Sequence, residues 1–491
     1  MARAQKIGLV ELVVGIIALV GSYAIYNIFF HPLRQYPGPW YTKSSRLWFI
    51  VKVFRGTVVY DIKQLHDKYG DIVRVAPNEL SYTNPDAWQE VYGRNNRDVG
   101  KLAIFKKDPT FYSGVFAEAN FYADIEGEPY KKQKKALLGG MTRKANLLQE
   151  DVLLEISGRL IGSLQSSTVS EPTFDIHPYL QNAAMDIMMR LIIGLDLQAI
   201  HSGDVPHPTT VTTDRAFRLS ILYLQFRRLS SLITDPLENL VGKLTLRFGM
   251  LDYMDFVTPL VQDRLKSSNP RPDFVSYMLP YLTTEEITKN AIMLTLAGSE
   301  STVSVLSSTL YFMLTKPKTF LLAQQEVRNL FHKASDITIE GSEQLVYLQA
   351  CITEAIRLFP PFWGAAPREV PAGGAVICGK YVPAKSTVSV YHWAMYQTER
   401  NFHDASEFKP ERWLGDKNEI ESKAYNPFSF GPRICIGKEI SLLVTRLTLA
   451  HLIWAYDFEL STESIGTGWE KPPAYMAPTR HPLFIKLRAR N

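Results

Sequence analysis

The longest apolar run in the chain lies close to its first residue. Nineteen consecutive positions, from Leu12 to Phe30, carry no charged side chain. A helix rises about 1.5 Å per residue, so this run is just long enough to cross a hydrocarbon core of about 30 Å. We therefore predict a short tail at 1–11 and one transmembrane anchor at 12–30. A cleaved signal peptide is the alternative, but the run ends in bulky Phe29-Phe30, where a signal peptide has small residues.

A proline-rich segment at 31–40 follows the predicted anchor. It contains Tyr36-Pro37-Gly38-Pro39, in which the prolines fix φ and remove backbone donors, so we predict a stiff non-helical hinge. Tyr36 and Trp40, like Tyr23 and Tyr26 in the anchor, are of the type found at membrane interfaces. Residues 41–491 show no internal repeat and no long Ser/Gly linker, so we expect one large domain there.

Within this domain, apolar positions recur mostly at helical spacing. The longest such stretch, 284–315, contains no proline and is predicted to form one long helix. Shorter β-rich pieces are punctuated by Gly and Pro. The pattern therefore predicts a mainly α fold with small β-sheets. Further helices are expected at 145–165, 180–195, 215–235 and 437–456, and strands at 72–75, 376–382, 387–391 and near the C-terminus.

Composition narrows the class of protein. Hydrophobic residues make up 46% and charged residues 21% of the chain, which argues against general disorder and against a membrane protein with many spans. The net charge of +5 over 491 residues is too small to indicate nucleic-acid binding. The three cysteines, Cys351, Cys378 and Cys435, are too few for a disulfide framework and lack the paired spacing of a zinc site. A reducing compartment fits this count, and any metal chemistry must use a single thiolate.

Cys435 lies directly before a predicted helix, in a loop that contains Phe428, Gly431, Arg433 and Gly437. The free N–H groups and positive dipole end of a helix N-terminus stabilise a thiolate. The glycines permit close approach to a flat ligand, and Arg433 suits a carboxylate on that ligand. A buried, inert cysteine is the alternative, but it leaves the glycines and the arginine unexplained. The segment resembles the haem-binding signature of the cytochrome P450 superfamily, and all five defining positions match.

The resemblance implies a cytochrome P450 fold and a b-type haem whose iron is bound by Cys435. The other four signature residues would help to hold this cofactor. The implied activity is that of a haem-thiolate monooxygenase, an oxidoreductase that inserts one oxygen atom from O2 into a hydrophobic small molecule. Residues 41–491 would then be the haem-thiolate catalytic domain.

Three further residues resemble a structural charge network of the superfamily. Glu354 and Arg357 are spaced i, i+3 on a predicted helix, and Arg412 follows in the segment 408–413. An isolated pair of this kind is usually a solvated surface pair. The order along the chain, with the cysteine loop coming next, is similar to the family's. The resemblance implies that the three residues form a buried network that fixes the cysteine loop.

The segment 297–302, Ala-Gly-Ser-Glu-Ser-Thr, lies within the long predicted helix and is similar to the oxygen-activation segment of the family. The resemblance implies that Glu300 and Ser301 relay protons to oxygen. The family usually has threonine where this chain has Ser301, so Thr302 is the alternative hydroxyl. Gly298 costs up to about 1 kcal/mol in mid-helix, which suits either a backbone that opens beside dioxygen or a close helix–helix contact.

Three residues resemble ligands of the haem propionates. Tyr130 and Lys134 hold positions like those of a Trp or His and an Arg in the family, and Arg368 is similar to another propionate-binding arginine. Tyrosine and lysine can both donate to a carboxylate, although lysine acts as a point charge without the arginine fork.

The chain contains no Rossmann fingerprint, flavin segment or iron–sulfur cysteine set. The resemblance therefore implies a separate electron donor, NADPH–cytochrome reductase, with a b-type cytochrome as a second donor. It also implies a single-pass protein of the endoplasmic reticulum membrane whose catalytic domain is cytosolic. Five lysines form either a docking face for an acidic partner or a solvated surface: Lys131, Lys132, Lys134, Lys135 and Lys438.

The substrate class is indicated only by apolar segments. Candidates for the pocket lining are 111–122, 220–233, 294–302, 361–366 and 474–478. The stretch 25–33 resembles fungal microsomal members that tailor terpenoids, polyketides or alkaloids in secondary metabolism. Two alternatives stay open: a haem-thiolate isomerase, dehydratase or peroxide-using enzyme that needs no reductase, and a haem-binding sensor without turnover.

Overall fold

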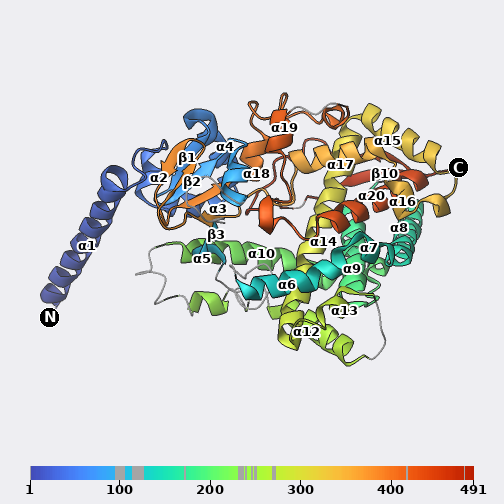
Figure 1. Cartoon of the computed structure of the whole chain (residues 1–491), viewed down its shortest axis with the longest axis horizontal. Coiled ribbons are helices and arrows are strands. Elements are labelled where there is room, and N and C mark those ends of the chain that lie inside the picture. The colour runs from blue at the N-terminus through green and yellow to red at the C-terminus, as the bar shows by residue number, and fades with distance from the viewer. Residues whose placement is uncertain are drawn as a thin grey trace.

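Helix α14 (Thr284–Thr315) runs through the centre of the computed structural model of the chain (Figure 1). A capping box fixes its start: the Glu286 N–H donates to Thr283 Oγ1, and the Thr283 N–H donates to Glu286 Oε2 at 2.8 Å. These bounds match the helix predicted at 284–315. The structure describes residues 2–93, 105–112, 127–170, 173–229, 237, 240–244, 247, 251–267, 272–415, 419–479 and 481–490.

Helix α9 (His177–Ile193) packs along α14 and is almost entirely buried. The two helices approach closely at Gly298, where an added Cβ would clash with the sulfur of Met188. Helix α14 continues through this glycine without a break. Of the two explanations that the sequence left for Gly298, the structure therefore supports the close helix–helix contact.

Two of the predicted helices differ from those observed. The stretch 145–165 divides into α7 (Arg143–Leu147) and α8 (Glu150–Ser170), with Thr142 capping α7 by accepting from the Ala145 N–H at 3.2 Å. Of the stretch 215–235, residues 215–227 belong to α10 (Pro208–Arg227), which starts earlier because proline is favoured in the first helical turn, and residues 230–235 lie outside the described residues. Periodicity located both helices but not their ends.

The domain is mainly helical, as the sequence predicts. The remaining helices are α1 (Ala2–Ile25), α2 (Trp40–Ser44), α3 (Leu47–Phe54), α4 (Val58–Tyr69), α5 (Pro109–Tyr112), α6 (Glu128–Leu138), α12 (Leu251–Lys266), α13 (Phe274–Met278), α15 (Pro317–Leu330), α16 (Ile339–Ser342), α17 (Val346–Leu358), α18 (His392–Tyr396), α19 (Glu419–Ala424) and α20 (Lys438–Ala455), with π-helical turns at η1 (Tyr26–Phe30) and η2 (Trp88–Tyr92).

In the described part of the chain, three small sheets flank the helices. The largest has the strand order β1-β2-β8-β5-β3, in which β2 and β8 pair in parallel and the other neighbours antiparallel. The strands are β1 (Ile72–Ala76), β2 (Glu79–Tyr82), β3 (Lys106–Lys107), β4 (Phe174–Asp175), β5 (Arg368–Glu369), β6 (Ala375–Ile377), β7 (Lys380–Val382), β8 (Thr387–Val390), β9 (Tyr456–Leu460) and β10 (Phe484–Ala489). The predicted strand 376–382 is a β6–β7 hairpin turned at Gly379.

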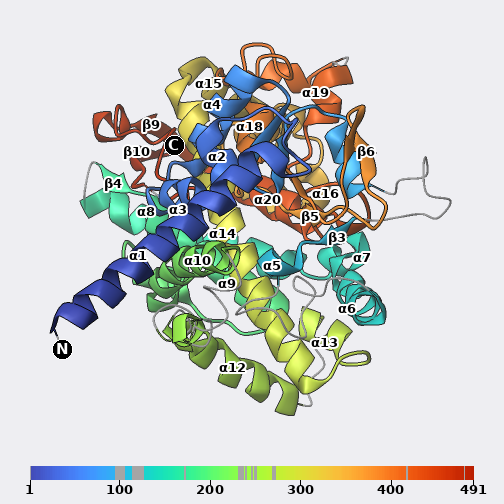
Figure 2. The same cartoon turned by 90° about the vertical axis from the view of Figure 1, so that its left-hand side faces the viewer.

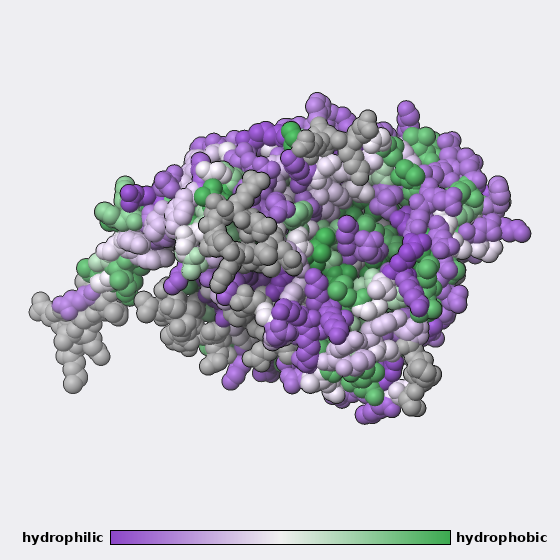
Figure 3. All heavy atoms as spheres, in the orientation of Figure 1, coloured by the Kyte–Doolittle hydropathy of each residue, from purple (hydrophilic) through white to green (hydrophobic). Residues whose placement is uncertain are grey.

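Helix α1 projects away from the body of the molecule (Figure 2). Hydrophobic side chains cluster on it near the body (Figure 3), and Ile16, Ile17 and Leu19 are 52%, 65% and 65% exposed. By combined length and hydropathy, none of the helices in the described part of the chain qualifies as a membrane span.

The segment predicted as a stiff hinge is packed against the body. Leu33 and Tyr36 are fully buried in a hydrophobic cluster around the five-stranded sheet. The Tyr36 hydroxyl donates to the Tyr381 carbonyl at 2.8 Å, and the Arg74 N–H donates to the Pro37 carbonyl at 2.8 Å. The expectation of Tyr36 at a membrane interface was wrong, because its ring completes this cluster. Trp40, by contrast, is 70% exposed.

Candidate active site

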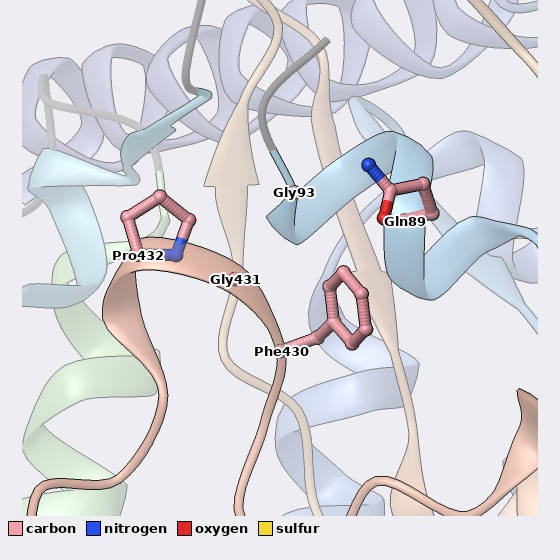
Figure 4. Close-up of a pocket in the computed structure, with 5 residues that line it drawn as sticks. All are labelled: Gln89, Gly93, Phe430, Gly431 and Pro432. Atoms are coloured by element: carbon pink, nitrogen blue, oxygen red, sulfur yellow. The ribbon is translucent and has the colours of Figure 1, made fainter.

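The cysteine loop is held in a shape that only glycine allows at one position. Gly431 has φ of +72°, and an added Cβ would clash with the carbonyl of Tyr92 in η2. The Cys435 N–H donates to the Phe428 carbonyl at 2.8 Å and so closes the loop. A hollow of about 300 Å³ lies beside this contact between the loop and η2 (Figure 4); its lining is Gln89, Gly93, Phe430, Gly431 and Pro432.

The Cys435 side chain combines two properties that rarely occur together. It has open accessible surface, yet surrounding protein atoms desolvate it, and this burial raises the pKa of its thiol. A hydrogen bond from the Gly437 N–H, at the start of α20, acts in the opposite direction. The thiol is therefore accessible although many protein atoms surround it. An added Cβ at Gly437 would meet only ordinary contacts, so the protein leaves room there.

A second open surface lies on the central helix α14. Ala297 is exposed although most of this helix is buried, and Leu294, Ser301 and Ser304 are half-buried. The spacing 294, 297, 301 and 304 places these residues on one face of the helix. Thr302 is 1% exposed and belongs to a different face. A helix at the centre of the fold thus has one partly exposed face, and that face includes Ser301.

Comparison with known proteins agrees with this geometry. The protein-family model described as Cytochrome P450 matches residues 37–482. This chain belongs to the cytochrome P450 family. Among similar proteins are the cytochrome P450 monooxygenase aclL of Aspergillus oryzae, 32% identical over 98% of this chain and 99% of the relative, and atr2 of Stereocaulon alpinum, 33% identical over 96% and 94%. The cytochrome P450 monooxygenase prhB of Penicillium brasilianum is 30% identical over 98% of each chain.

The residues of this cytochrome P450 offer what a haem requires of its surroundings. A flat group needs open protein surface, which Cys435 and the Ala297–Ser301 face of α14 provide. Its propionates need cationic and hydrogen-bonding groups at one edge. Both requirements are met by side chains of the described residues.

The predicted propionate ligands come together beside the cysteine loop. Tyr130 Oη and Lys134 Nζ, both on α6, donate to the carbonyl of Pro432 at 3.0 and 3.1 Å. The Arg433 guanidinium lies 3.2 Å from the centroid of the Tyr130 ring. Burial raises the pKa of the Tyr130 hydroxyl, and the nearby charges of Arg433 and Arg368 oppose that rise. Three positively charged side chains from different segments, Lys134, Arg433 and Arg368, therefore lie near Tyr130.

The predicted charge network is assembled and buried. Glu354 accepts from Arg357 Nε and Nη2 at 2.9 and 2.8 Å, and from Arg412 Nε at 3.0 Å. Burial acts to raise the pKa of Glu354, but the two arginines and the Lys409 N–H bring it below its usual value. Trp413 also belongs to this network, because its indole N–H donates to Glu354 Oε2 at 2.8 Å. It was not predicted from the sequence, although it is the residue next to Arg412 in the segment 408–413.

The network extends to the segment that leads into the cysteine loop. Arg412 Nη1 donates to Glu421 Oε1 at 2.7 Å, and the ring centroids of Trp413 and Tyr425 are 4.5 Å apart. The Tyr425 hydroxyl donates to the Thr353 carbonyl at 3.0 Å. These contacts connect α17, which carries the Glu354 pair, to the stretch ahead of the loop.

Parts of the predicted pocket lining lie outside the described residues, namely 113–122 and 230–233. The segments at 361–366 and 474–478 are joined by hydrogen bonds. The N–H groups of Trp363 and Gly364 both donate to the Met476 carbonyl, at 2.8 and 2.9 Å. An added Cβ at Gly364 would clash with the Met476 side chain, so these two segments form one wall.

Proposed function

We propose that this cytochrome P450 is a haem-dependent monooxygenase that inserts one oxygen atom from O2 into a hydrophobic small molecule. The observation that carries this is the exposed Cys435 side chain at the N-terminus of α20, in a loop whose shape Gly431 fixes and where the Gly437 N–H acts on the thiol. Haem with a thiolate ligand supplies the activation of dioxygen when bound. The protein's own residues hold the cofactor, exclude bulk water and deliver protons.

We infer that Ser301 is the hydroxyl that hands protons to the reacting oxygen, with Glu300 as its source. Ser301 lies on the open face of α14, whereas Thr302 is buried. Ser301 Oγ donates to the Ala297 carbonyl at 2.7 Å, which holds the oxygen in a defined orientation. In a relay, Ser301 Oγ would accept a proton from a carboxylic acid, while its own hydroxyl proton leaves the Ala297 carbonyl and passes to the reacting oxygen.

Arg433, Arg368, Tyr130 and Lys134 would bind the propionates. Carboxylates need charge-assisted donors to leave water, and this cluster supplies two guanidinium groups, an ammonium group and a phenol. Lys134 would exchange its contact with the Pro432 carbonyl for a carboxylate oxygen without leaving the site.

Membrane attachment through residues 12–30 is part of the proposal, with the catalytic domain on the cytosolic side of the endoplasmic reticulum. Two features support it: the uncharged run itself and the exposed apolar side chains along α1. Exposed Trp40, Leu47 and Phe54, at 70%, 62% and 68%, follow directly after it. Such side chains are stabilised by lipid rather than by water.

Electrons would come from NADPH through a separate reductase, with a b-type cytochrome as a second donor. Two lysines of the predicted docking face are already paired, Lys131 with Glu128 at 2.6 Å and Lys132 with Glu286 at 2.8 Å. We therefore centre the docking face on the cysteine loop and Lys438 rather than on α6. Exposed rim charges of this kind affect the association rate more than affinity.

The substrate is proposed to be a hydrophobic intermediate of fungal secondary metabolism. The wall built from 361–366 and 474–478 is mainly apolar, and the similar proteins of known name are fungal monooxygenases. Screening extracts and purified terpenoids, polyketides and alkaloids with microsomes that contain a reductase would identify it.

The central test is the reduced carbon-monoxide difference spectrum of membranes that contain the full chain. A thiolate ligand gives a red-shifted Soret band, which Cys435→Ala should abolish. Cys351→Ala is the matched control, because Cys351 is a buried thiol on α17 with no proposed role. Retention of the band in Cys435→Ala would end the proposal. A normal band without NADPH oxidation in the presence of reductase would instead favour a sensor, or an enzyme that needs no reductase.

A further inference from the structure

A fully buried arginine in β1 has no partner for its charge. Among the described residues, the Arg74 guanidinium has one acceptor, the Pro77 carbonyl, to which Nε donates at 2.9 Å and Nη2 at 2.6 Å. Its Nη1 is buried and has no hydrogen-bond partner in the described part of the chain. Buried charges are normally paired with opposite charges. This guanidinium therefore adds a positive charge that no described carboxylate balances.

Arg74 lies next to the place where α1 joins the body. Its carbonyl accepts from the Thr42 hydroxyl of α2 at 2.8 Å. Helix α2 in turn contacts η1, because Asn27 Nδ2 donates to the Ser44 carbonyl at 3.0 Å. Figure 1 shows α2 beside the end of α1 that meets the body, and the two helices are in contact. The unbalanced charge is therefore close to the end of the proposed membrane anchor.

Two half-buried nitrogen donors lie near Arg74. The Lys43 ammonium group, one residue after Thr42, makes no ion pair or hydrogen bond with any residue that the structure describes. The Leu33 N–H donates to His31 Nδ1 at 3.0 Å, so a neutral His31 ring has its proton on Nε2 and can donate from there. Burial and the charge of Arg74 lower the pKa of Lys43, and they lower that of His31 to about 4. His31 is thus a neutral donor at pH 7.

Helix α2 also places an aromatic ring on the same side as Lys43. Trp40 and Lys43 are spaced i, i+3 in this helix, so they share one face, and Trp40 is 70% exposed. Tryptophan rings are favoured at the level of the lipid headgroups, where cationic side chains meet lipid phosphates. This combination, directly after residues 12–30, favours a lipid phosphate as the anion that balances Arg74.

We propose that Lys43 and His31 bind the phosphate of an anionic phospholipid headgroup and that the buried charge of Arg74 strengthens this binding. Lys43 Nζ and His31 Nε2 would donate to phosphate oxygens, whereas Arg74 would act through its electric field without contact. The inference rests on the proposed membrane attachment. It deepens that proposal by naming the lipid chemistry that the junction between α1 and the body selects.

The test measures the lipid bound to the full-length holoprotein in detergent by native mass spectrometry. Dioleoylphosphatidic acid is the anionic probe, and dioleoylphosphatidylcholine, whose choline group balances its phosphate, is the comparison. We expect one phosphatidic acid to bind about tenfold more tightly than phosphatidylcholine. In Lys43→Met, which keeps the apolar stem, this preference should fall to less than about twofold. Persistence of the tenfold preference in Lys43→Met would overturn the proposal.

Lys52→Met is the matched control for the loss of one positive charge. Lys52 is also half-buried, but it lies in α3 and pairs with Asp61 at 2.7 Å. The control should keep the preference for phosphatidic acid. An equal loss in Lys52→Met would show a general effect of net charge and would refute a site at Lys43. Inorganic phosphate in large excess should not displace the lipid; if it does, the site binds free phosphate and the lipid assignment is wrong.

Lys43→Glu tests the unbalanced charge of Arg74 without any lipid. It brings a carboxylate near Arg74, so it should raise the thermal unfolding midpoint by about 1–2 °C in detergent free of anionic lipid. The same variant should lose the preference for phosphatidic acid. An unchanged or lower midpoint would mean that the charge of Arg74 is already balanced, which contradicts the premise of the proposal.

Alkaline extraction of membranes separates this inference from the proposal on which it rests. Release of the wild-type chain into the supernatant would refute membrane attachment and the headgroup site together. A wild-type chain that stays in the membrane fraction but binds both lipids equally would refute the headgroup site alone.

Discussion

Individual residues of the site are distinguished by what their side chains face. Ser301 and Thr302 are neighbours with similar hydroxyls, but only Ser301 lies on the open face of α14. Gly431 and Gly437 are both glycines of the cysteine loop, but only Gly431 is required by the protein's own backbone. Each pair permits a test in which one member serves as control for the other.

Ser301→Ala should reduce product formation by about 10²-fold in reconstituted membranes, because a positioned proton donor is lost. More of the oxidised NADPH should then appear as hydrogen peroxide. Ser301→Thr should restore coupling, since the hydroxyl is kept. Ser299→Ala is the control: Ser299 is 3% exposed and donates to the Thr295 carbonyl, so its loss should leave the peroxide yield unchanged. An equal effect of Thr302→Ala would assign the role to Thr302.

Gly431→Ala and Gly437→Ala should both impair the protein, the first by lowering its folding stability and the second by lowering its haem content. At Gly431 the φ of +72° and the clash with the Tyr92 carbonyl strain the fold itself, so we expect a loss of at least about 1–2 kcal/mol in denaturant unfolding. At Gly437 the protein offers room, and a methyl group would intrude only on the cofactor's space. Haem content should fall in Gly437→Ala while the stability of the haem-free protein is unchanged. A large stability loss in Gly437→Ala would contradict this division.

The positions of the helices in this fold depend on contacts between distant segments, which the hydrophobic periodicity of the sequence does not predict. The approach of α9 to α14 depends on Gly298 facing Met188, and the link from α17 to the cysteine loop depends on one carboxylate shared by two arginines. Both contacts join segments that are more than fifty positions apart in the sequence.

Gly298→Ala should destabilise the protein by about 0–2 kcal/mol, because overpacking against Met188 costs about 1–3 kcal/mol and the gain in helix propensity offsets about 1 kcal/mol of it. Met188→Ala should relieve most of this cost in the double variant, as measured by denaturant unfolding of all four proteins in a cycle. Failure of Met188→Ala to relieve the cost would show that Gly298 is needed for another purpose, such as room beside dioxygen.

Glu354→Gln should cost about 3–5 kcal/mol at neutral pH, because Arg357 would keep its charge in a fully buried site. The pKa of Glu354 is lowered in the fold. Its contribution to the free energy of unfolding is therefore complete above the unfolded pKa of about 4.3 and is lost as the pH falls through the folded value. Stability of Glu354→Gln should consequently depend less on pH in the acid range than that of the wild type.

Glu286→Gln provides the comparison for Glu354→Gln. Glu286 pairs with Lys132, whose side chain is 42% exposed, so its removal should cost less than about 1 kcal/mol. If Glu286→Gln and Glu354→Gln lost the same free energy of unfolding, the buried network would contribute no more to stability than an exposed ion pair.

At the scale of the whole molecule, helix α1 projects from the body of the molecule (Figure 1). The projecting part is α1, whereas the segment 31–39 after it belongs to the body through Leu33, Tyr36 and Pro37. Any membrane attachment through α1 would therefore keep the body of the molecule close to the membrane surface. The exposed Trp40 and Phe54 would lie next to the point of attachment.

Replacing Ile17 and Leu19 together by arginine should release the full chain from membranes. Each arginine in a membrane helix costs about 2.5–3.5 kcal/mol. We expect the variant to appear in the supernatant after alkaline extraction, with its carbon-monoxide spectrum intact, since both side chains are exposed and lie outside the domain core. Ile17→Leu with Leu19→Val is the apolar control. Continued membrane retention of the arginine variant would contradict anchoring by this helix.

The sequence by itself determined the central helix at 284–315, the mainly α class and the cysteine loop. These depend on short-range causes: apolar periodicity, capping residues and a signature of five positions within ten. Only the tertiary structure decided that Ser301 lies on the partly exposed face of α14 and Thr302 does not, that Gly298 accommodates Met188, and that the buried Arg74 lies against α2. The reason is physical, because burial and ion pairing depend on which distant segments are in contact, and no local pattern records those contacts.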